Sequence, residues 1–155
     1  MSVRQEKRKY WVLPPDEEEY KSGRLRVYQN LLRARGITDL ETLRLLTAHP
    51  MIEVGSLDPS VDGDHGCSAG IPQLHVCSHF GISAKTFRSR HPEWKTWEYQ
   101  MQFMATEMVK RIKKYGDVRL AIISWNLPAA ANAGVDTKAR YFEKVKKQSL
   151  RLVLQ

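Results

Sequence analysis

A single carboxylate, Glu53, lies at the edge of a short apolar segment of this 155-residue chain. Met51 and Ile52 precede it and Val54 follows it, and residues 55–73 are polar and rich in glycine. An apolar environment penalises the charged form of a carboxylic acid and so keeps the group protonated to higher pH. The pattern suits a general acid beside a loop that leaves room for a substrate. On these residues alone, a solvated glutamate at the end of a helix is the first interpretation, because glutamate side chains are mostly exposed.

Asp64, within the glycine-rich loop, is the candidate second carboxylate. A second carboxylate near a general acid can serve as the base that holds and activates an attacking water. An aspartate in a turn also commonly bonds to its own loop backbone. The residues alone leave both interpretations of Asp64 open.

The elements that must position Glu53 are predicted to be mostly helical. Apolar residues at spacings of three and four predict a helix from Asp16 to Gly36. Asp39 is expected to cap a second helix, and Pro50 to kink or end that helix just before Glu53.

After the loop, which is expected to contain at most a short hairpin, the chain again favours helices. They are expected at residues 74–80, 93–115 and 118–126, with a last helix that begins at Asp136 and directs Tyr141, Phe142 and Val145 inward. The predicted fold class is therefore mostly α, or α+β, with a helical bundle around a cleft.

Residues 1–15 are charged and end in two prolines, so we interpret them as an arm attached to a single domain over residues 16–155. Net charge and the absence of known motifs limit the classes of partner. The net charge of +8 favours an anionic partner such as a cell-wall polymer, and we find no motif for specific nucleic-acid binding. We expect no membrane span and no secretory signal.

The segment "GDHGCSAGIPQLH", residues 63–75, resembles the goose-type lysozymes and lytic transglycosylases of the lysozyme-like superfamily. In that family a helix ends in a catalytic glutamate, and a variable loop leads to a segment G-D-x-G-x-x-G-Φ-x-Q, where Φ is apolar. Glu53 occupies the position of that glutamate. The matching loop positions are Gly63, Asp64, Gly66, Gly70, Ile71 and Gln73.

Two further pieces follow in the family's order, so the resemblance covers about residues 38–147. "LAIISWN" is similar to a helix reading A-x-x-A-Y-N, with Trp125 in place of the tyrosine, and it ends in Asn126. "ARYFEKV" supplies Tyr141, which corresponds to a tyrosine in the family's final helix. The sequence departs from the family at Val54, usually serine, and at His75, often aspartate in the goose-type enzymes.

The resemblance implies a lysozyme-like fold that cleaves peptidoglycan at the β-1,4 bond between N-acetylmuramic acid and N-acetylglucosamine, with Glu53 as general acid and base. Gln73 and Asn126 would bind the sugar N-acetyl group or brace the acid, Tyr141 would lie near it, and Trp125 would line the cleft. Alternatively, the side-chain amides of Gln73 and Asn126 would only cap backbone groups. Tyr141 and Trp125 would then be ordinary residues of the hydrophobic core.

Several functions remain open from the sequence. The enzyme would be a hydrolase or, as the departure at His75 favours slightly, a transglycosylase. Without a signal, we expect it to reach the wall by holin-type release or on a virion, as a phage lytic protein or beside phage-tail components. The alternative is a non-catalytic lysozyme-like structural or wall-binding module of a phage tail. A basic nucleic-acid-binding helical protein is supported by net charge alone.

Three histidines and two cysteines lie close together in sequence: His65, Cys67, His75, Cys77 and His79. On two strands their spacing would place them on one face, as a structural zinc site requires. The sequence lacks a C-x-x-C or H-E-x-x-H pair, and the resemblance places residues 75–79 at the start of a helix. A Cys67–Cys77 disulfide is the favoured alternative if the protein works outside the cytoplasm, and we expect no metal or other cofactor.

Overall fold

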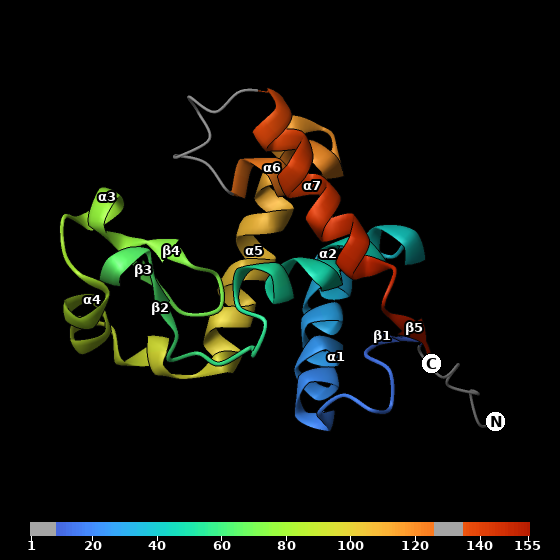
Figure 1. The fold of residues 1–155 in the computed structure, drawn as a ribbon, viewed down its shortest axis with the longest axis horizontal. Coiled ribbons are helices and arrows are strands. Elements are labelled where there is room, and N and C mark those ends of the chain that lie inside the picture. The colour runs from blue at the N-terminus through green and yellow to red at the C-terminus, as the bar shows by residue number, and fades with distance from the viewer. Residues whose placement is uncertain (1–8, 126–134) are drawn as a thin grey trace.

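The protein is built mostly of helices, and its sheets are small (Figure 1). The computed structural model describes residues 9–125 and 135–155, with side chains described for residues 9–125 and 138–155. The mostly helical α+β class predicted from the sequence is confirmed in this part of the chain.

The first two helices build the base of the larger hydrophobic core. Helix α1 spans Glu19–Ala34 and buries Leu25, Tyr28 and Leu32. Its end and its buried stripe agree with the sequence prediction, because these side chains recur at spacings of three and four.

Helix α2 spans Leu40–Glu53, and Pro50 lies inside it. The side chain of Asp39 caps its start by accepting the backbone N–H of Thr42 at 2.9 Å, as predicted. The expectation that Pro50 ends the helix just before Glu53 is wrong, because α2 continues through Pro50 to Glu53. A proline in the last turn removes its own N–H donor, but its carbonyl still accepts the N–H of Val54 at 2.9 Å.

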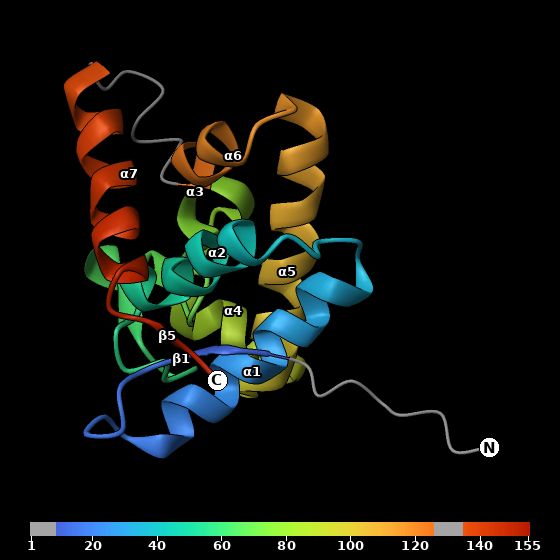
Figure 2. The same cartoon turned by 90° about the vertical axis from the view of Figure 1, so that its right-hand side faces the viewer.

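The N-terminal segment is part of the fold from the first strand onward. Strand β1, Trp11–Val12, pairs antiparallel with β5, Val153–Leu154, so β1 lies beside the C-terminal strand of the chain (Figure 2). Residues 11–13 are buried, and the fully buried side chain of Gln29 bonds both the N–H and the carbonyl of Trp11, at 2.8 and 2.7 Å. The prediction of an arm over residues 1–15 is therefore wrong for residues 11–13, which are buried and, at Trp11 and Val12, paired with β5.

The glycine-rich loop folds into a three-stranded antiparallel sheet rather than a single hairpin. Its strands are β2 Asp62–Gly63, β3 Ser68–Ala69 and β4 Leu74–His75, with a 3-10 turn at Asp64–Gly66. Helix α3, Val76–Phe80, follows and ends at Gly81, whose φ of 67° suits glycine. Helix α4, Ala84–Arg90, completes this lobe, which has a separate small core around Phe87 and Trp94.

The long helix α5, Trp97–Tyr115, runs between this lobe and the other helices (Figure 1). It begins four residues later than the predicted 93–115, because Pro92–Lys95 form a 3-10 turn and the Thr96 side chain caps α5. Helix α6, Val118–Trp125, and helix α7, Val135–Ser149, then complete the larger core, where Val145 is fully buried. Among the described residues, no helix combines the length and the apolar character needed to cross a lipid bilayer.

Cys67, the residue before β3, and Cys77, near the start of α3, form a disulfide. The predicted pairing is therefore present, and the two sulfurs are not available as thiolate ligands of zinc. No group of three or more metal-binding side chains is assembled within residues 9–125 and 135–155.

Removing the disulfide is expected to lower the free energy of unfolding by about 3 kcal/mol, the value that loop-closure entropy gives for a short loop. Urea unfolding with and without a reductant measures this difference. The Cys67→Ala/Cys77→Ala variant is the control, because the reductant should not change its stability. Two free thiols in denatured, unreduced protein would contradict the bond.

Candidate active site

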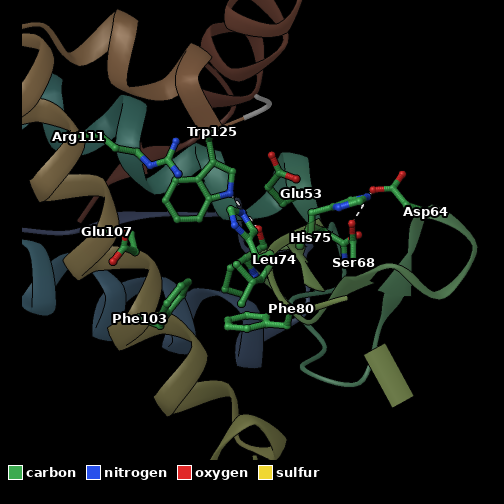
Figure 3. Close-up of a pocket in the computed structure, with 13 residues that line it drawn as sticks. Glu53, Asp64, Ser68, Leu74, His75, Phe80, Phe103, Glu107, Arg111 and Trp125 are labelled. Atoms are coloured by element: carbon green, nitrogen blue, oxygen red, sulfur yellow. Dashed lines mark hydrogen bonds between the residues drawn. The ribbon is translucent and has the colours of Figure 1, made fainter. Parts of the chain in front are cut away.

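A pocket of about 960 Å³ lies between the small-sheet lobe and the helices α2, α5 and α6. Figure 3 shows the side chains that surround it. Of the six residues predicted from the sequence to form the site, four line this pocket: Glu53, Asp64, Gln73 and Trp125. The small lobe, the end of α2 and the helix pair α5–α6 thus converge on one cavity.

Glu53 is the last residue of α2, and the helix end places its carboxylate at the wall of the pocket. The side chain is 14% exposed, so it is shielded from bulk water yet open to a ligand. Tyr141 of α7 donates a hydrogen bond from its hydroxyl to Oε1 of Glu53. The structure thus brings together the carboxylate and the tyrosine that the sequence resemblance placed near it.

Tyr141 is held as a hydrogen-bond donor by its surroundings. Burial raises the pKa of its hydroxyl well above the ordinary range, and the negative charge and hydrogen bond of Glu53 raise it further. The hydroxyl therefore keeps its proton across the physiological pH range. Oε1 of Glu53 has a permanent donor on its buried side.

His49 completes this group, and the sequence analysis did not identify it. Its fully buried ring places Nε2 2.8 Å from the Tyr141 hydroxyl and 3.5 Å from Oε1 of Glu53. The signal was available in the spacing, because residues four apart lie on the same face of a helix and His49 precedes Glu53 by four.

Trp125 forms the pocket wall on the α6 side. Its indole N–H donates to the carbonyl of Pro72 at 2.9 Å, which joins the end of α6 to the loop of the small lobe. The Arg111 guanidinium lies 4.8 Å from the centre of the Trp125 ring, and the ring of His49 meets it edge-on at 5.3 Å. These three contacts fix the plane of the indole beside Glu53. Asn126, the next predicted residue, lies outside the described residues.

Asp64 and Gln73 line the pocket but also bond to their own lobe. Oδ2 of Asp64 accepts the Ser68 hydroxyl at 2.5 Å, and the exposed carboxylate sits on a backbone with φ of 50°. The amide nitrogen of Gln73 donates to the carbonyls of Gly70 and Val61, at 2.9 and 3.3 Å. The hydrogen bonds that Gln73 makes to described residues go to its own loop and not to Glu53, so they hold the loop in place.

The far side of the pocket carries residues that the sequence analysis did not select. Glu107 and Arg111 point into it from α5, one helical turn apart, and aromatic faces come from α3 and α5 through Phe80 and Phe103. Phe80 is 56% exposed, which is unusual for a large aromatic side chain. The clue in the sequence was the four-residue spacing of Glu107 and Arg111, which places both side chains along one side of α5, next to its apolar stripe of Met101, Met104 and Met108.

A buried amide holds the small lobe against α5. Gln100 is fully buried; its Oε1 accepts the N–H of Ile71 at 2.7 Å, and its Nε2 donates to the carbonyls of Trp94 and Pro59, at 2.5 and 2.9 Å. Gly70 lies directly against this amide, where a Cβ would come within 2.5 Å of Oε1. The position of the pocket loop therefore depends on Gln100.

Comparisons of the chain with protein-family models, with curated proteins and with solved structures found no match. The lysozyme-like family thus stays a prediction from the sequence motifs. The functional argument rests on the residues and geometry of the pocket.

Proposed function

We propose that the protein cleaves the glycan strands of peptidoglycan at the β-1,4 bond between N-acetylmuramic acid and N-acetylglucosamine. The observation that carries the proposal is the placement of Glu53: a mostly shielded carboxyl group at a helix end, held from behind by Tyr141 and open in front to a pocket of about 960 Å³. The motif order of the sequence supports the same reaction.

Glu53 is proposed as the group that moves the proton. As general acid it protonates the glycosidic oxygen, and the bond from the anomeric carbon of the muramic acid to that oxygen breaks. In a transglycosylase a hydroxyl of the same muramic acid then bonds to the anomeric carbon, and Glu53 takes up the proton that this hydroxyl loses. One carboxyl group thus serves both steps.

The pocket walls suit a sugar chain. Trp125, Phe80 and Phe103 offer apolar faces, while Glu107 and Arg111 offer polar groups that fix an orientation. The net charge of +8 supports attraction to an anionic cell wall, although it does not select the bond that is cut. The experiment that tests the proposal is digestion of purified peptidoglycan by the wild type and by the Glu53→Gln variant.

We propose transglycosylase-type products, which are anhydro-muropeptides one water lighter than hydrolysis products. Asp64→Asn should then keep most of the activity, because no water has to be activated and the new amide oxygen still accepts from Ser68. Rates of release of soluble muropeptides from purified peptidoglycan provide the comparison. A hydrolase that uses Asp64 as general base would instead lose about 100-fold or more and would yield reducing-end products.

A further inference from the structure

The imidazole of His49 has one partnered and one unpartnered nitrogen. Nε2 lies 2.8 Å from the Tyr141 hydroxyl, while the buried Nδ1 has no hydrogen-bond partner. The ring is enclosed edge-on by the rings of Trp125 and Tyr141, with centroids 5.3 and 6.1 Å away. His49 does not line the pocket, so any effect on a ligand acts through its neighbours.

Counting donors fixes the direction of the hydrogen bonds. The Tyr141 hydroxyl has one proton, which it donates to Oε1 of Glu53. Its oxygen must therefore accept a proton from Nε2 of His49, which requires the neutral tautomer with Nε2–H. The opposite direction would need a proton on Nδ1, and that N–H would be buried without an acceptor.

We propose that His49 is a positioning residue that assigns the transferable proton of Glu53 to Oε2. The order of donation runs from His49 to Tyr141 to Oε1, so Oε1 only accepts. A protonated Glu53 must then carry its hydrogen on Oε2, which has no hydrogen-bond partner among the described residues. The inference rests on the proposed function, because it concerns the atom from which Glu53 delivers the proton.

The tautomer is measurable without any activity. Long-range ¹⁵N–¹H correlation spectra of labelled protein distinguish a protonated Nε2 from a protonated Nδ1. We expect the neutral Nε2–H form in the wild type, and a shift of the Nε2 and Nε2–H signals in Tyr141→Phe, where the accepting oxygen is gone. A neutral ring protonated on Nδ1 would overturn the inference whether or not the protein cleaves peptidoglycan.

Variants test whether the donor matters for the reaction. His49→Leu removes the donor and should lower kcat on soluble glycan strands by about 10- to 100-fold, with little change in KM. A misaligned Glu53 carboxyl group slows the proton transfer more than it weakens binding of the glycan. His49→Gln places an amide N–H where Nε2–H was and should restore most of that loss. Urea unfolding of both variants separates this effect from a loss of folded protein.

A double-mutant cycle tests whether His49 acts through Tyr141. In the Tyr141→Phe background, His49→Leu should lower kcat by less than about threefold, because the hydroxyl group through which His49 acts is already absent. Equal losses in both backgrounds, or no rescue by His49→Gln, would contradict the inference. If the wild type releases no product while the spectra show Nε2–H, the proposed function fails and the hydrogen-bond order stands.

Discussion

Glu53→Gln is expected to abolish nearly all release of soluble muropeptides from peptidoglycan. The substitution keeps the size and shape of the side chain and removes the transferable proton. General acid–base catalysis contributes about 100- to 10,000-fold, and the later base step would be lost together with the acid step. The decrease in rate should therefore lie at or beyond the upper part of that range.

The same variant should stay folded. The amide oxygen of glutamine can still accept the hydrogen bond from the Tyr141 hydroxyl, so the buried hydroxyl keeps its partner. A group placed for chemistry is commonly not optimal for stability, so we expect unfolding free energies equal to the wild type or slightly higher. Glu41→Gln, an exposed substitution in the same helix, is the matched control and should keep full activity. Wild-type rates in Glu53→Gln would refute the mechanism.

Gln100→Leu is expected to lower the free energy of unfolding by about 3 kcal/mol or more. The change removes one acceptor and one double donor from a fully buried position, which leaves the N–H of Ile71 and the carbonyls of Trp94 and Pro59 without that partner. Each buried backbone group left unpaired costs about 1–3 kcal/mol, and neighbouring losses do not add fully.

Gln102→Leu is the matched control for this prediction, because it makes the same change two residues away on the exposed face of α5. Its unfolding free energy should stay within about 0.5 kcal/mol of the wild type. Urea unfolding measures both variants. If Gln100→Leu were as stable as Gln102→Leu, the small lobe would not depend on this amide for its position against α5.

Local sequence signals predicted the helix boundaries well where a cap or a glycine defines them. Asp39 opens α2, and Gly116 ends α5 with a φ of 67°, because a side-chain oxygen and a left-handed backbone satisfy the free groups at helix ends. Pro50 was misjudged because a proline near the end of a helix loses one donor and can still accept. The strand at Trp11 was missed because its partner lies at the other end of the chain.

The candidate site was predictable to the extent that its residues belong to short motifs. Glu53 and Trp125 reach the same pocket from segments that the sequence analysis had singled out. His49 was discoverable from its spacing to Glu53, but the Tyr141 hydroxyl that joins the two is 92 residues away from His49 in sequence. Gln100 gave no local signal, because its partners are backbone groups brought to it by the fold.

The mass of the muropeptides released from purified peptidoglycan tests the central claim most directly. The protein should release disaccharide-peptide fragments whose glycan ends at muramic acid, in the anhydro form, and Glu53→Gln should release almost none. Fragments that arise only from cleaved peptide or amide bonds, or no soluble fragments from any peptidoglycan tested, would contradict the account.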